Sequence, residues 1–313
     1  AAAVGTEADR VAVHCVHPHD TPWPDRDAQD LLDSHDCPNV IMVGDWCEQA
    51  RAKTATAAAT ALGNPQHCTH ITTGQAPVDR IASNRRVMGD DGKVRAVRWT
   101  KTLDPDLHAA PEGVIDRMLK TIGFWNEERK IACLHYYAVH PTTVDGTGVV
   151  TPEFVGLARN QRSKDDNGVP HIYFTGCAGN ITAGKYNNGN PENRPVFMGR
   201  ILDAMKASEG AAARQSLSTL TWHIEQACLP PREDLEEEKL LEIIRSPDSE
   251  TEKLKSKAAL MLTYLRCWEE PIPITCLRLN DEVDILHLPG ETFIEYQLYA
   301  QELRPRGFVA VAG

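Results

Sequence analysis

Apolar and polar residues alternate with a period of two in several short parts of the chain and follow a helical period in others. A period of two is typical of half-buried strands, and apolar residues at every third or fourth position are typical of amphipathic helices. Strand-like stretches occur at residues 11–15, 94–100, 171–175, 217–230 and 307–313. Residues 119–141 have the pattern of a β-hairpin with a polar turn at 126–128, and residues 274–303 that of a hairpin followed by a helix. Helical stretches occur at residues 44–65 and 196–208.

Strand and helix patterns alternate along the chain, and some neighbouring strands form hairpins. We therefore predict an α/β fold with a mixed β-sheet core flanked by helices. Residues 232–269 have the pattern of a helical hairpin that is interrupted at "SPDS" and has glutamate-rich outer faces. We expect this hairpin to be a solvated surface insertion. Strand patterns lie close to both ends, so we also expect the chain to be incomplete at both.

Charge and composition exclude several classes of protein. The chain of 313 residues has 33 Lys and Arg against 44 Asp and Glu, a net charge of −11, which disfavours binding to nucleic acid. It contains no apolar run long enough for a transmembrane segment and no recognisable signal peptide. The nine cysteines are scattered without a CxxC pair, and most are expected to be buried as small apolar residues.

The first strand-like stretch ends in two histidines, His17 and His19, in "VHPHDTP". Because alternate residues of a strand share a face, both histidines would lie on the same face as the apolar residues Val11, Val13 and Cys15, just beyond them. A pair of imidazoles at a strand end suits a divalent metal such as Zn²⁺, although the pair alone also fits ordinary hydrogen-bonded histidines.

Two more candidate ligands follow strand patterns far along the chain. His140 follows the predicted hairpin in "YYAVHPTT", and Glu291 lies between a strand and a helix in "LPGETF". Two histidines and a carboxylate are the ligands of many catalytic zinc sites, so we expect His17, His140 and Glu291 to converge. The chain lacks HExxH, which excludes a zincin-type protease. His67 and His70 fit such a site less well, because the pair lies at the start of a loop.

Five motifs in this order, "VHPHDTP", "ASNRR", "YYAVHPTT", "YFTGCAGNITAG" and "LPGE", resemble the catalytic domain of the neutral/alkaline non-lysosomal ceramidases, particularly the shorter bacterial members. The resemblance extends from Val11 to about Gly313. It implies that the chain is a single catalytic domain of this type. It also implies a secreted or periplasmic location.

The resemblance implies a role for each matched residue. His17, His140 and Glu291 correspond to zinc ligands, and His19 to a histidine that faces the substrate carbonyl. The arginine of the substrate pocket corresponds to Arg85, or less closely to Arg86. Thr182 occupies the position of the family's serine. Three residues of the matched motifs are expected in substrate binding, although the last two also fit ordinary turns: Asn84, Asn180 and Gly179. The family's tyrosine ligand would follow "VAVAG", where this sequence ends.

These assignments predict zinc-dependent hydrolysis of an amide C–N bond by a zinc-activated water. His19 and Arg85 would stabilise the oxyanion, and His19 would transfer a proton to the leaving amine. The substrate would be a small-molecule or lipid amide such as ceramide. Two alternatives are a (β/α)₈ amidohydrolase and a non-catalytic binding protein that has kept the fold. The sequence leaves the oligomeric state open.

Overall fold

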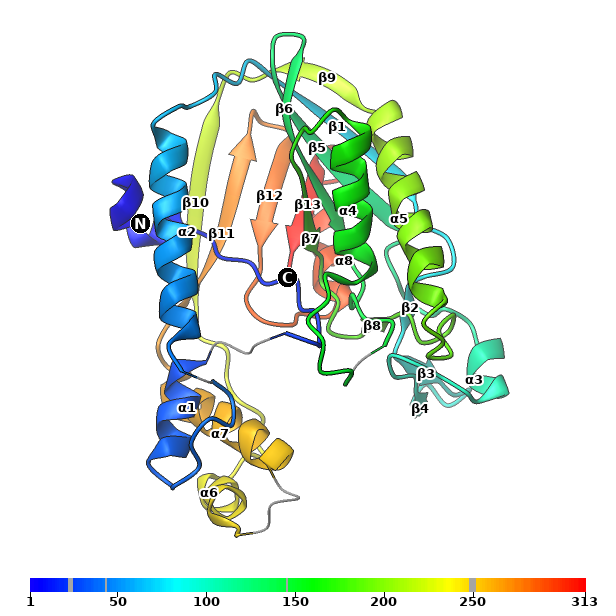
Figure 1. Ribbon diagram of the computed structural model, residues 1–313. Coiled ribbons are helices and arrows are strands. Elements are labelled where there is room, and N and C mark those ends of the chain that lie inside the picture. Colours follow the sequence, from blue (N-terminus) through cyan, green and yellow to red (C-terminus); the bar gives the residue numbers. More distant parts are fainter. Residues whose placement is uncertain (22–24, 43, 145, 248–251) are drawn as a thin grey trace. The chain divides into compact units, whose positions relative to one another are not determined.

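A computed structural model describes residues 1–21, 25–42, 44–144, 146–247 and 252–313 (Figure 1). The α-helices are α1 (Arg26–Asp33), α2 (Trp46–Leu62), α3 (Pro105–Ala109), α4 (Glu153–Asp165), α5 (Asn193–Gly210), α6 (Glu237–Arg245), α7 (Glu252–Cys267) and α8 (Ile294–Glu302). The strands are β1 (His70–Pro77), β2 (Ser83–Asn84), β3 (Arg86–Met88), β4 (Val94–Val97), β5 (Met118–Asn126), β6 (Arg129–Tyr137), β7 (His171–Thr175), β8 (Ile181–Thr182), β9 (Ala213–Ser216), β10 (Leu220–Ala227), β11 (Ile272–Leu279), β12 (Val283–His287) and β13 (Phe308–Ala312). The predicted α/β class with mixed sheets is confirmed.

The chain divides into two compact units. The first consists of Ala1–Val11, Pro22–Pro65 and Glu225–Pro273, and the second of Ala12–Thr21, Gln66–Ile224 and Ile274–Gly313. Every residue of the candidate site belongs to the second unit.

The predicted helical hairpin at residues 232–269 consists of α6 and α7 of the first unit. Its apolar side chains pack together with those of α1 and form the core of this unit, so the hairpin is more than a solvated surface element. The buried members include Leu32, Leu240, Ile244, Ala259 and Leu262. Asp248 and Ser249 of the predicted break lie outside the described residues.

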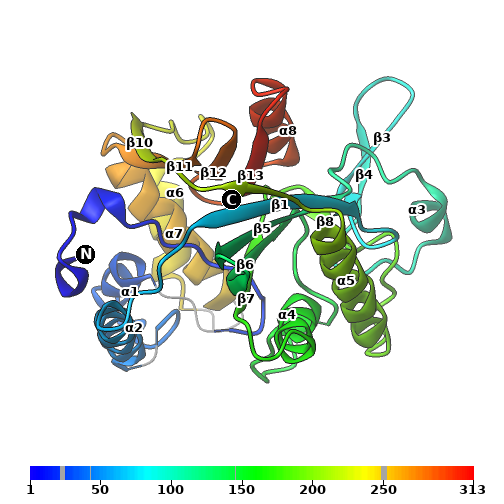
Figure 2. The ribbon, with the colours of Figure 1, turned by 90° about the horizontal axis from the view of Figure 1, so that it is seen from above.

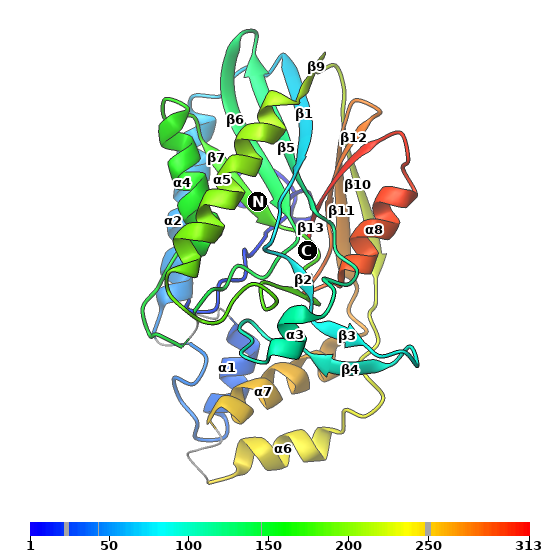
Figure 3. The ribbon, with the colours of Figure 1, turned by 90° about the vertical axis from the view of Figure 1, so that its right-hand side faces the viewer.

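Two sheets lie wholly or mostly in the second unit (Figure 2). The larger sheet has the strand order β7-β6-β5-β1-β9, in which β6 and β7 are parallel and β1 is antiparallel to both neighbours. The second sheet has the order β10-β11-β12-β13, with β12 and β13 parallel. Helices α4 and α5 lie on one side of the larger sheet, and α8 lies beside the second sheet (Figure 3).

The side chains of β13 alternate between two clusters of buried residues. Ala310 and Ala312 pack with Ile71 and Ile122 of the larger sheet. Val309 and Val311 lie in a separate cluster to which Ala300 of α8 contributes. Strand β13 is therefore covered on both faces, which explains why it is a continuous apolar run.

The carboxyl ends of the parallel strands meet at one place. The amide of Gly313, directly after β13, donates to the carbonyl of Thr175 at the end of β7 over 3.1 Å. His140 follows β6, and Glu291 follows β12. The topology thus brings the segments that carry these candidate ligands to a common edge.

The expected strand at residues 11–15 is wrong. These residues have no regular secondary structure, and Val13, predicted to be buried, is 86% exposed. Val16 packs against the core instead, and its carbonyl accepts from the hydroxyl of Thr175 at 2.8 Å. His14 Nε2 accepts from the amide of the same threonine at 3.1 Å. Side-chain contacts to β7, and not a backbone ladder, determine which side of this segment faces inward.

Two further features differ from expectation. Helix α4 was not predicted, because its sequence is mostly polar and its buried face is short. Of the nine cysteines, Cys133 and Cys177 are buried and the others are partly or fully exposed, so the expected burial of most was wrong. Among the described residues, no helix has the length and apolar character needed to cross a bilayer.

Candidate metal centre

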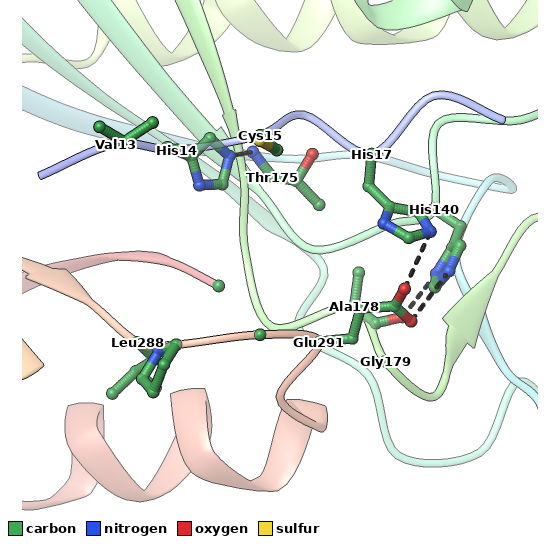
Figure 4. A pocket seen from close by; sticks show the side chains of 13 residues that line it. Val13, His14, Cys15, His17, His140, Thr175, Ala178, Gly179, Leu288 and Glu291 are labelled. Atoms are coloured by element: carbon green, nitrogen blue, oxygen red, sulfur yellow. Dashed lines mark hydrogen bonds and ion pairs between the residues drawn. The ribbon is translucent and has the colours of Figure 1, made fainter. Parts of the chain in front are cut away.

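His17, His140 and Glu291 converge from three distant parts of the sequence (Figure 4). The Nε2 atom of His17 lies 3.0 Å from Oε1 of Glu291, and Nε2 of His140 lies 3.6 Å from Oε2 of the same carboxylate. The two imidazole rings lie 4.8 Å apart between centroids and are nearly perpendicular. Two nitrogen donors therefore point at one carboxylate.

His140 is oriented by carbonyl oxygens behind it. Its Nδ1 atom lies 2.7 Å from the carbonyl oxygen of Ala178 and 3.1 Å from that of Ile181. Because a carbonyl can only accept, Nδ1 must carry the proton, and the lone pair of Nε2 faces Glu291. Burial, with the nearby charges of Arg85 and His17, lowers the pKa of His140 to about 4. The ring is therefore neutral at pH 7, as a metal ligand must be.

His17 has a backbone conformation that is rare for a residue with a side chain. Its φ angle is 61°, in the left-handed region. Such strain concentrates at functional sites, where the surrounding structure maintains it. This conformation also ends the alternation of exposed and partly buried side chains along residues 11–16.

Glu291 is held ionised. Its hydrogen bond with His17, assisted by the charge of Arg85, lowers the pKa of the carboxyl to about 2. A negative carboxylate and a neutral imidazole meet the requirement that metal ligands be deprotonated.

The spacing of the donors suits a zinc ion. Ligand atoms at about 2.0–2.1 Å from a tetrahedral ion lie about 3.3 Å from each other. The two nitrogen–oxygen distances, 3.0 Å from His17 to Oε1 and 3.6 Å from His140 to Oε2 of Glu291, lie on either side of that value. The side chains present therefore fit a zinc ion without large movement.

His19 lies beside this group of donors. Its ring centroid is 5.3 Å from that of His17 and 5.7 Å from that of His140, and ligand atoms of the three histidines lie within 4.8 Å of one another. Two donor sets therefore overlap, one with three histidines and one with two histidines and Glu291. We favour the second as the metal set, because it includes the negative charge that a divalent ion prefers.

The two arginines of "ASNRR" have different environments. Arg85 is partly buried, and its charge acts on both Glu291 and His140. Burial lowers the pKa of its guanidinium, against the opposing effect of Glu291, and its buried Nε atom has no hydrogen-bond partner in the protein. Arg86 is exposed and lies 4.3 Å above the ring of Phe293. Of the two, Arg85 is the one whose charge acts on the proposed ligands.

Two other residues singled out in the sequence are buried and bond to the backbone of neighbouring segments. Asn84 is buried, donates to the carbonyl of Val114 and accepts from the amide of Arg86. Thr182 is fully buried, and its hydroxyl lies 3.4 Å from the carbonyl of Trp99.

Gly179 and Asn180 hold adjacent backbone segments together. A Cβ atom on Gly179 would lie 2.2 Å from the carbonyl oxygen of Glu291, so this position requires glycine. The side chain of Asn180 is 2% exposed and bonds to the start of α8.

A cavity of about 310 Å³ opens beside the candidate ligands. His17, His140 and Glu291 line it together with small and apolar residues, among them Val13, Ala178, Leu288 and Pro289. A group of moderate size could therefore approach the centre along an apolar wall.

A second group of potential ligands was not expected from the sequence. Cys133, His171 and Glu209 bring ligand atoms within 4.8 Å of one another. They come from β6, β7 and α5, and no spacing along the chain relates them. Burial, with the charge of Glu209, raises the pKa of Cys133 to about 12, so it is a neutral thiol and a poor ligand.

Cations already occupy the surroundings of this second group. Lys130 lies 2.7 Å from Glu209 and 2.8 Å from Asp166, and Arg162 lies 2.7 Å from Glu209. His171 bonds to Asp166 at 3.0 Å. Two acids and two bases balance each other, so we interpret this group as a buried ion-pair network.

No described sequence family and no curated protein matches the chain. Solved structures with a similar fold include a neutral ceramidase from Pseudomonas aeruginosa, with a TM-score of 0.53 and 15% identity over 83% of this chain and 47% of that one. A ceramidase complexed with C2 also has a TM-score of 0.53 and 15% identity, over 84% of this chain and 50% of that one. The chain thus spans about half the length of these neighbours and shares their fold.

Proposed function

We propose that this chain is a zinc-dependent hydrolase that cleaves the C–N bond of an N-acyl amide. The observation that carries the proposal is the convergence of His17, His140 and Glu291, with His140 held in the tautomer that a metal needs. The ceramidase-like fold and the five sequence motifs support the same chemistry. The proposed substrate is a small-molecule or lipid amide, with ceramide as the first compound to test.

His17, His140 and Glu291 would hold the ion. When bound, zinc supplies a Lewis acid that makes water nucleophilic near neutral pH. The protein would contribute the two imidazole nitrogens, the ionised carboxylate and the apolar wall that directs the acyl group.

Arg85 would stabilise the negative charge that develops on the amide oxygen. Its side chain is only partly buried and its charge acts on both His140 and Glu291, so the guanidinium can stabilise a substrate oxygen bound beside them. His19 would protonate the leaving amine, since its ring lies beside both histidine ligands.

Thr182 is a poor candidate for a nucleophile. Its side chain is fully buried and its hydroxyl lies 3.4 Å from the backbone carbonyl of Trp99, so a substrate could reach the hydroxyl only if the surrounding residues moved. Attack by water agrees better with this arrangement.

The two alternative functions receive less support. A (β/α)₈ amidohydrolase has a closed parallel barrel, whereas β5 is antiparallel to both β1 and β6 here. A purely binding role lacks the support that the convergence of His17, His140 and Glu291 gives to metal-dependent hydrolysis.

The test combines metal analysis with an activity assay. The purified chain, reconstituted with zinc and dialysed, should contain about one zinc per chain and release fatty acid from a fluorescent short-chain ceramide. H140A and E291Q should lose the zinc, whereas H67A, which changes an exposed histidine, should keep it. Absence of zinc in the reconstituted wild type would overturn the proposal.

A further inference from the structure

The loop Ala178–Thr182 touches the residues on each side of the candidate centre. The carbonyls of Ala178 and Ile181 lie within hydrogen-bond distance of His140 Nδ1, at 2.7 and 3.1 Å. The carbonyl of Asn180 accepts from the amide of Arg85 at 2.7 Å. One short segment therefore fixes the backbone or ring position of two residues of the proposed site.

The same loop also holds the segment that carries Glu291. The amide of Gly179 donates to the carbonyl of Thr292 at 2.9 Å. The side chain of Asn180 continues this connection, since its Oδ1 accepts from the amide of Ile294 and its Nδ2 donates to Oε2 of Glu295, both at 2.9 Å.

The bond to Ile294 replaces a missing helix cap. The first amides of a helix have no partner within the helix and usually bind an Asn, Asp, Ser or Thr at the N-cap. The N-cap of α8 is Phe293, which makes no side-chain cap bond. Asn180, distant in sequence, supplies the acceptor for the first amide of α8.

We propose that Asn180 is a positioning residue that sets the location of Glu291 relative to His140 and Arg85. It does so by anchoring the start of α8, three residues after Glu291, to the loop that orients His140 and Arg85. Both ends of its side chain bond to α8, and the side chain is 2% exposed, so its role is internal and not substrate contact. The inference rests on the proposed metal function for its consequence, but the anchoring can be measured without metal.

Three variants distinguish the effect of losing the hydrogen bonds of Asn180 from the effect of changing its side-chain volume. N180L removes both polar atoms at similar size. N180D/E295Q keeps both contacts with donor and acceptor exchanged between the two side chains. E295Q alone leaves an acceptor for Asn180 Nδ2 and serves as the control for the swap.

The matched structural control is N187L. Asn187 is also a fully buried asparagine, and its Nδ2 donates to the carbonyls of Thr100 and Thr143, away from α8. N187L should lose thermal stability as N180L does, without acting on the Glu291 segment.

Two measurements test the proposal. The first is zinc affinity by competition with a chelating dye, for which N180L should bind about 10- to 100-fold more weakly, the effect typical of residues that orient ligands. N180D/E295Q, E295Q and N187L should stay within about threefold of wild type. The second is amide hydrogen exchange of the metal-free protein at residues 291–296, which should become faster in N180L and recover in the double variant.

Wild-type zinc affinity in N180L, or no recovery in N180D/E295Q, would overturn the proposal while leaving the zinc site intact. If the wild type bound no zinc, the proposed function would fail, and the exchange data would still decide whether Asn180 anchors this segment. Unchanged exchange in N180L would then contradict the anchoring. If N180L does not fold, N180S takes its place, because the shorter side chain cannot reach both partners.

Discussion

The Nε2 atom of His17 lies 3.0 Å from Oε1 of Glu291, although these residues come from opposite ends of the chain. One is in a segment without regular structure, and the other follows β12. Their proximity depends on the meeting of two sheets at the carboxyl ends of parallel strands. A zinc ion between them would link both segments, so its binding should also stabilise the fold.

His19 and His17 are expected to differ in what their loss removes. H19A should retain zinc and lower kcat by about 10²-fold, because His19 is proposed to transfer a proton. H17A should lose zinc, since its nitrogen faces Glu291 directly. Metal analysis and steady-state kinetics on both variants check this. Loss of zinc in H19A would show that the three-histidine donor set holds the ion.

Replacement of Arg85 should affect the transition state more than the metal. R85M is expected to keep zinc and lower kcat by about 10²- to 10³-fold, the usual effect of removing an oxyanion donor. R86M is the matched control, because Arg86 is exposed and stacks on Phe293. Loss of this contact should lower kcat by no more than about 2- to 5-fold. Equal losses in the two variants would argue against a specific role for Arg85.

Gly179 should tolerate no side chain. G179A is expected to push the Glu291 carbonyl away, because the new Cβ would lie 2.2 Å from that oxygen, and zinc affinity should fall at least about tenfold. G199A, at a helical position with nothing within 4 Å of the added carbon, should fold normally and gain about 0.5–1 kcal/mol in stability. Calorimetry and zinc titration compare them. Normal zinc binding by G179A would mean that the Glu291 loop can move freely.

The hydroxyl of Thr182 should be dispensable for hydrolysis. T182V keeps the shape of the side chain and loses a bond of 3.4 Å to the Trp99 carbonyl, so stability should fall by about 1 kcal/mol and kcat by less than about threefold. A nucleophilic threonine would behave differently, with activity abolished in T182V and retained in T182S. Kinetics on this pair distinguish the two mechanisms.

Stability should depend on pH through the buried pair His135 and His171. Their ring nitrogens lie 2.8 Å apart, and burial lowers the pKa of both, most strongly that of His135. The unfolded chain therefore binds more protons than the folded chain below about pH 6.5, and the free energy of unfolding falls as the pH decreases from that value.

H135Q is expected to flatten this dependence by up to about 1.4 kcal/mol per pH unit, because one titrating group is removed. Urea unfolding of metal-free protein between pH 5 and 8, with H67A as the control, measures the slopes. Parallel curves for wild type and H135Q would show that His135 is not the titrating group.

Local sequence patterns determined much of this protein. The alternation in β5 and β6, with a polar turn between them, predicted a hairpin, because a strand's side chains alternate whatever it packs against. The Pro-Gly turn after β12 and the helix beyond it were equally readable. His17, His140 and Glu291 could be singled out because each follows a recognisable strand-like pattern and matches a motif.

Tertiary structure decided what local patterns could not. Residues 11–15 alternate like a strand, but no neighbouring strand pairs with their backbone, and contacts of His14 and Val16 with β7 determine which side is buried. Asn180 looks like a turn residue in sequence, yet it caps a helix far along the chain. Both outcomes depend on which distant segments come into contact. The amino-acid pattern of one segment determines its local conformation but does not specify the segment against which it packs.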